Sequence, residues 1–66
     1  MSYHTLLTRD GRRWSIQFGD YDWHVVNSER ADYRRQYMAQ DLKIITTADD
    51  QAAIDAAVAK LNGASE

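Results

Sequence analysis

The chain has 66 residues and a net charge of −2, with 44% hydrophobic and 27% charged residues. This composition is typical of one folded globular domain that spans residues 1–66, and it argues against a disordered segment. The absence of cysteine excludes disulfides and thiolate zinc sites. The first residues contain no basic region followed by a long apolar run, so we expect a soluble, cytoplasmic protein without membrane contact.

Residues 3–18 predict a β-hairpin, because the dipeptide Asp10-Gly11 is a favoured type I′ turn between two short β-rich runs. With this two-residue loop, Arg9 would face Arg12. The pattern then predicts one apolar face formed by the cross-strand pairs Leu7/Trp14, Thr5/Ile16 and Tyr3/Phe18. The other face would carry the pairs Leu6/Ser15, His4/Gln17 and Thr8/Arg13.

A helix is predicted over residues 22–38, after Gly19 breaks the strand and Asp20 or Asp22 caps the helix. Its apolar stripe consists of Trp23, Val26, Tyr33 and Tyr37. Arg30 falls inside this stripe. We therefore expect Arg30 to be the least exposed arginine and to pair with a carboxylate, with Asp20, Asp41 and Glu29 as candidates.

Residues 42–47 predict a third strand, and a second helix follows it as far as about Asn62. A capping signal begins at Thr47, with Asp50 three residues later, and Gly63 supplies the stop. The helix has a core stripe of Ile54, Ala57, Val58 and Leu61.

These elements predict an α+β fold, a single ββαβα domain with a three-stranded sheet. A right-handed crossover through the first helix favours strand order 2-1-3, with the third strand beside the first. We expect the two helices to cover one face of the sheet and to leave the opposite face open.

The sequence contains no recognisable catalytic motif or metal site. His4 and His24 are the only histidines, and neither they nor the serines stand in a local motif such as a nucleophile elbow. The run Asp20-Tyr21-Asp22 lacks the further oxygen ligands of a calcium loop, because His24 and Ala31 occupy their places. We expect no enzymatic activity, no cofactor and no bound metal.

Two groups of arginines suggest nucleic-acid binding as an alternative function, since arginine beside exposed aromatic rings can contact phosphate and stack on bases. The first group surrounds the hairpin turn and the second lies on the first helix: Arg9, Arg12 and Arg13, and Arg30, Arg34 and Arg35. Ten carboxylates outnumber the cations, and no known nucleic-acid-binding motif is present.

A protein interface is the preferred prediction. The open sheet face would expose Leu6 and Ile45, accompanied by His4 and Lys43, while Tyr21 and Trp23 would be partly covered at the start of the first helix. The second strand should form one sheet edge, and residues 13–18 contain neither proline nor lysine to block pairing. Partner docking and homodimerisation are both open on this prediction.

In length and in its lack of catalytic motifs, the chain resembles small accessory proteins of phages and bacterial mobile elements, including inhibitors of host defence. This resemblance implies a binding protein that occludes the surface of a host protein. We therefore rank a protein-interaction module first, nucleic-acid binding second and an enzyme third.

Overall fold

The computed structural model describes residues 1–63 as one sheet and two α-helices. The elements in chain order are β1 (Ser2–Asp10), β2 (Arg13–Asp20), α1 (Trp23–Tyr33), η1 (Ala39–Asp41), β3 (Leu42–Ala48) and α2 (Gln51–Leu61). This order confirms the predicted ββαβα domain. No helix in this part of the chain is long and apolar enough to cross a membrane.

The sheet has the order β2-β1-β3, and β1 is antiparallel to both of its neighbours. The predicted strand order is confirmed. Because β2 and β3 both run against β1, they run parallel to each other, and α1 carries the chain from one outer strand to the other. β2 and β3 are therefore the two edges of the sheet.

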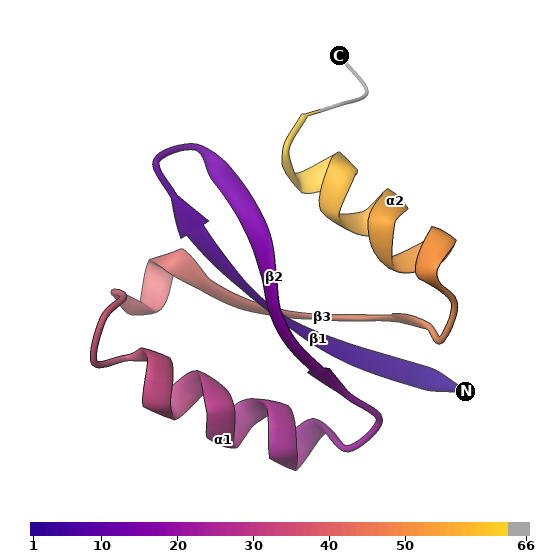
Figure 1. The fold of residues 1–66 in the computed structure, drawn as a ribbon, viewed down its shortest axis with the longest axis horizontal. Helices are drawn as coiled ribbons and strands as arrows, with labels where there is room; N and C mark the ends of the chain where they lie inside the picture. The colour runs from indigo at the N-terminus through magenta and orange to yellow at the C-terminus, as the bar shows by residue number, and fades with distance from the viewer. Residues whose placement is uncertain (64–66) are drawn as a thin grey trace.

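The two helices lie on opposite faces of the sheet (Figure 1). Leu6 and Leu7 are both 0% exposed, and successive strand residues point to opposite faces, so both faces must be covered at the centre of β1. Val26 of α1 and Ile54 of α2 are also buried. The prediction that both helices cover one face was wrong, because the central strand has a continuous buried run rather than an alternating one.

The hairpin turn differs from the prediction by one position. Asp10 pairs with Arg13, so the two-residue loop is Gly11-Arg12. Gly11 has a φ of 64°, and among residues 1–63 no residue other than glycine has a positive φ, which is the pattern of a type II′ turn. This register places opposite charges across the strands, whereas the predicted one would have placed Arg9 against Arg12.

A β-bulge changes the register further along the hairpin. Leu7 pairs with Ile16, but Leu6 pairs with Phe18, so β2 contains one extra residue at Gln17. The shifted turn makes the predicted pairs of this hairpin wrong, including Leu7/Trp14, Thr5/Ile16 and Tyr3/Phe18. The bulge in addition moves Phe18 to the face that α1 covers. Gly19 follows, and the ring of Tyr3 lies so close to it that a Cβ atom would collide.

Both helices begin at aspartate N-caps. Asp22 accepts a hydrogen bond from the His24 N–H at 2.9 Å, and Asp50 accepts one from the Ala53 N–H at 2.7 Å. The second cap was predicted at Thr47, which instead belongs to β3. Gly63, at a φ of 72°, lies at the predicted stop of α2.

α1 ends at Tyr33, several residues before the predicted end. Residues 34–37 form tight turns that lead toward η1. Arg30 is exposed and forms no ion pair with a carboxylate among residues 1–63, so its predicted burial and pairing were wrong. Arg9 is instead the arginine that pairs with a carboxylate, because its guanidinium lies 3.0 Å from Asp41.

Candidate functional site

The edge of the sheet at β2 is closed by a side chain from the end of α2. The Oδ1 atom of Asn62 accepts a hydrogen bond from the Trp14 N–H at 2.7 Å, and its Nδ2 atom donates one to the Trp14 carbonyl at 3.1 Å. One amide side chain thus satisfies both backbone groups that Trp14 directs outward. The bulge at Gln17 interrupts the same edge.

The contact between Trp14 and Asn62 also establishes which groups of β3 face outward. The N–H and C=O groups of successive strand residues point to opposite sides within the sheet plane. Those of Trp14 point away from β1, so those of its partner Arg9 point away from β2 and toward β3. The N–H and C=O groups of Leu7, two residues away, also point toward β3, so Leu7 forms a hydrogen-bonded pair with Lys43. The N–H and C=O groups of Ile44 and Thr46 therefore point away from the sheet.

The edge at β3 has none of the protection found at β2. Its pairing with β1 is continuous from Leu42 to Ala48, without a bulge. The strand contains no proline and one lysine, Lys43. Within the described part of the chain, no hydrogen bond reaches the outward N–H and C=O groups of Ile44 and Thr46. An edge of this kind is a template for another strand.

A hollow of about 530 Å³ lies between β3 and α2. Apolar side chains of Ile45, Ala57 and Leu61 line it, and Leu61 is 37% exposed. Lys43 and Lys60 lie at the same hollow. Long lysine side chains commonly place their stems on apolar surface and their ammonium groups in water. This hollow therefore has an apolar lining and cationic residues around it.

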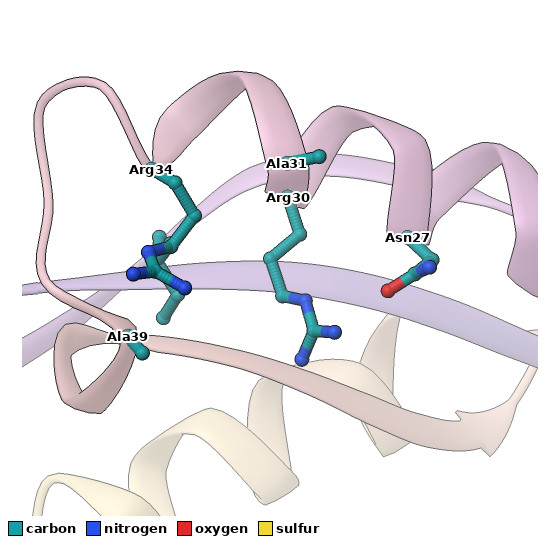
Figure 2. A pocket seen from close by; sticks show the side chains of 6 residues that line it. Asn27, Arg30, Ala31, Arg34 and Ala39 are labelled. Carbon is teal, nitrogen blue, oxygen red and sulfur yellow. The ribbon is translucent and has the colours of Figure 1, made fainter.

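A second hollow, of about 320 Å³, lies between α1, η1 and the start of β3. It is lined by Asn27, Arg30, Ala31, Arg34, Ala39 and Leu42. Figure 2 shows the side chains of Arg30 and Arg34 extending from α1 toward β3. Neither arginine pairs with a carboxylate of residues 1–63, and the Oδ1 atom of Asn27 is buried there without a hydrogen-bond partner.

The residues predicted to bind a partner do not form one surface. Leu6 is 0% exposed beneath α1, so it belongs to the core rather than to a docking face. Ile45 is half-buried at the hollow between β3 and α2. Tyr21 and Trp23 are 52% and 42% exposed, and they lie where the chain enters α1. The open face on which this prediction depended is covered.

Tyr21 lies at the end of the sheet where both helices begin. Its ring packs edge-on against Tyr3 at a centroid distance of 5.0 Å, and its hydroxyl donates a hydrogen bond to Asp49 at 3.3 Å. The negative charge of Asp49 raises the pKa of the Tyr21 hydroxyl above its usual value. The same end also holds Asp20, whose carboxylate accepts from the Asp22 N–H at 2.8 Å.

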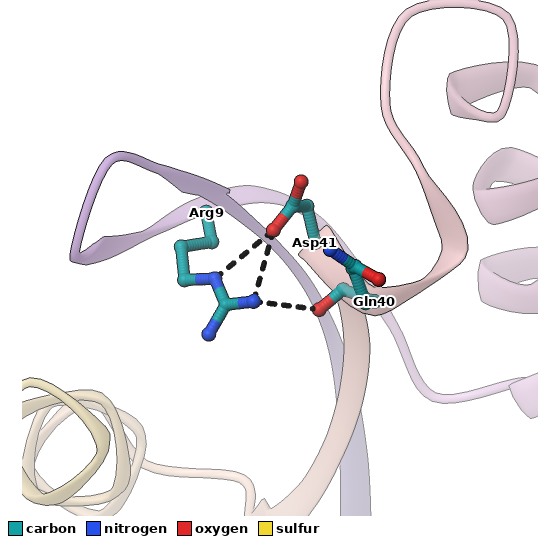
Figure 3. Close-up of polar contacts among 3 residues, drawn as sticks. All are labelled: Arg9, Gln40 and Asp41. Atoms are coloured by element: carbon teal, nitrogen blue, oxygen red, sulfur yellow. Dashed lines mark hydrogen bonds and ion pairs between the residues drawn. The ribbon is translucent and has the colours of Figure 1, made fainter.

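The first arginine group is partly occupied by intramolecular contacts. Arg9 donates from Nε to Asp41 at 3.0 Å and from a terminal nitrogen to the Gln40 carbonyl at 3.3 Å (Figure 3). Its guanidinium also lies 5.0 Å from the centre of the Trp14 ring. Arg9 is therefore held in place, while Arg12 and Arg13 are exposed at the turn.

Only part of the second arginine group comes together. Arg30 and Arg34 line the hollow beside β3, whereas Arg35 is exposed and does not line it. The signal in the sequence was the spacing of four residues between Arg30 and Arg34, which places both on one side of a helix. The sequence did not indicate that this side would flank a sheet edge.

The histidines do not form a catalytic or metal-binding group. The Nδ1 atom of His4 lies 2.9 Å from the Thr46 hydroxyl, and the ring of His24 packs against Trp23. Among the described residues, no three histidine or acidic side chains are gathered around a common point. Comparisons with protein-family models, curated proteins and solved structures gave no match to this chain.

Proposed function

We propose that the protein is a non-catalytic interaction module that binds an extended segment of a partner protein along β3 as a fourth strand. The observation that carries this proposal is the uninterrupted edge of β3, with outward backbone groups at Ile44 and Thr46. Main-chain hydrogen bonds provide the affinity in such strand addition, and side-chain pockets provide the specificity. The hollows at β3 are suited to hold side chains of the added strand and so to provide specificity.

A foreign partner fits this edge better than a second copy of the chain. Pairing β3 with its own copy would bring together two sets of the cations beside it: Arg30, Arg34, Lys43 and Lys60. Like charges facing each other across an interface oppose association. A partner segment held in this way is covered by the domain, which supports the role of an accessory protein that acts by occlusion.

The proposal is tested with linear peptides selected from a random library against the purified protein. We expect Thr46→Pro to weaken the selected peptides by about tenfold or more, because proline removes an outward N–H of β3 without removing a bond to β1. The matched control is Ile16→Pro, which removes the corresponding outward N–H of β2. It should leave affinity unchanged.

A third variant isolates the backbone effect. Thr46→Val removes the hydroxyl that contacts His4 but keeps the backbone N–H, and it should bind as the native protein does. Equal loss of affinity in the two proline variants, with both proteins folded by circular dichroism, would contradict binding at β3. Selected peptides that bind Thr46→Pro with native affinity would contradict it as well.

A further inference from the structure

We infer that the β3 edge selects a strand of alternating character, with acidic side chains on the α1 side and apolar side chains on the α2 side. This inference rests on the proposed function and specifies the chemistry of its partner. Side chains of an added strand alternate between the two faces, and each shares a face with the β3 residue opposite it. Residues opposite Ile44 therefore face α1, and those opposite Ile45 face α2.

On the α1 side, Arg30 and Arg34 form a site for a carboxylate. They lie one helical turn apart, where two like charges destabilise a helix slightly unless an anion lies between them. Both line the 320 Å³ hollow at the start of β3, and neither pairs with a carboxylate of residues 1–63. Guanidinium groups bind carboxylates through charge-assisted, often bidentate hydrogen bonds.

Asn27 adds a polar group one turn earlier on the same side of α1. Its buried Oδ1 has no partner within residues 1–63, and an unsatisfied buried polar atom is unfavourable. A flip of the side-chain amide, which exchanges Oδ1 and Nδ2, would present Nδ2 to the hollow as a donor. Asn27, Arg30 and Arg34 would then all present donors to the same hollow.

On the α2 side, the lining favours apolar side chains. Ile45, Ala57 and Leu61 supply apolar surface within the 530 Å³ hollow. An apolar side chain of the added strand would cover this surface and remove it from water. Lys43 and Lys60 extend the positive charge around the edge, which adds to the attraction for an acidic segment.

Four acidic residues are used at the end of the sheet where both helices begin, and Asp41 beside the start of β3 is paired with Arg9. Asp22 and Asp50 cap the two helices, Asp20 binds the Asp22 N–H, and Asp49 binds Tyr21. The protein is acidic as a whole, with a net charge of −2. Four cations nevertheless line the two hollows at β3: Arg30, Arg34, Lys43 and Lys60.

The test uses short blocked peptides in which valine alternates with glutamate, glutamine or lysine. Affinity is measured by calorimetry, and the bound site by amide hydrogen exchange at Ile44 and Thr46. We expect the glutamate peptide to bind about tenfold more tightly than the glutamine peptide, and the lysine peptide to bind most weakly. The double variant R30Q/R34Q should remove the preference for glutamate, while the matched control R35Q should keep it.

The outcomes separate this inference from the proposed function. If the glutamine peptide protects Ile44 and Thr46 and binds as tightly as the glutamate peptide, strand addition stands and the acidic preference is overturned. If the preference survives R30Q/R34Q but disappears in K43Q/K60Q, the assignment of the acidic side chains to the α1 side is overturned. Protection by none of the peptides would overturn both.

Discussion

The two edges of this sheet belong to strands of similar length that pair with the same central strand, yet the backbone of one edge is protected and that of the other is open. At β2, Asn62 satisfies both outward groups of Trp14, and a bulge interrupts the edge. At β3, the ladder is regular, and the groups at Ile44 and Thr46 have no partner within residues 1–63. Natural proteins usually protect their edges against strand pairing. This difference between the two edges is the reason we propose that a partner strand pairs with β3.

The largest expected effect comes from removing the protection of β2. Asn62→Ala should lower the free energy of unfolding by about 1–3 kcal/mol, because it leaves the Trp14 N–H and C=O without partners in a partly buried place. Chemical denaturation measures the change. Asn62→Asp keeps the acceptor but places a carboxylate oxygen against the Trp14 carbonyl and a negative charge at the C-terminal end of α2, so it should also lower stability. An Asn62→Ala protein with native stability would show that the side chain does not secure this edge.

A smaller effect is expected at the turn that leads into β2. Gly11→Val should cost more than ~1 kcal/mol, because a β-branched residue resists the positive φ that Gly11 adopts. The matched control is Arg12→Val in the same loop, where φ is not positive, and it should cost clearly less. Equal melting temperatures for the two variants would contradict the type II′ turn.

The hairpin, the element order and the strand order were predictable because they depend on local signals. Two short β-rich runs and a glycine turn define the two strands, and a right-handed crossover through α1 favours the order found. The placement of α2 was missed, although the adjacent Leu6 and Leu7 at the centre of β1 offered a signal. Two consecutive apolar residues in a strand point to opposite faces, which favours cover on both faces.

The candidate site could not be predicted from the sequence because it depends on contacts between distant parts of the chain. Asn62 and Trp14 are separated by 48 positions, and no local pattern links an asparagine after a helix to a strand edge. Arg30 was assigned to the core because its spacing fits the stripe of α1. The end of α1 at Tyr33 and the position of β3 leave Arg30 beside an edge instead.

The smallest expected effect concerns the contact that joins the ends of the two edge strands. Tyr21 follows β2 and Asp49 follows β3, and Asp49 raises the pKa of the Tyr21 hydroxyl in the folded state. The folded protein therefore keeps this proton to a higher pH than the unfolded chain does. Stability should fall slightly as pH rises past the usual tyrosine value of about 10.

Tyr21→Phe serves as the control for this alkaline loss. It removes the ionisable hydroxyl and keeps the packing of the ring against Tyr3, so part of the decline in melting temperature above that pH should disappear. A native and a Tyr21→Phe protein with the same alkaline profile would show that Asp49 does not influence the ends of the two edge strands through this hydroxyl.

Amide hydrogen exchange along β3 tests the central claim most directly. In the protein alone, the Ile44 and Thr46 amides should exchange rapidly, while Ile45 in the same strand and Trp14 at the protected edge exchange slowly. Addition of a selected peptide should slow Ile44 and Thr46 and leave Trp14 unchanged. Ile44 and Thr46 amides that are already protected in the protein alone, or that stay rapid when the peptide is bound, would contradict strand addition at β3.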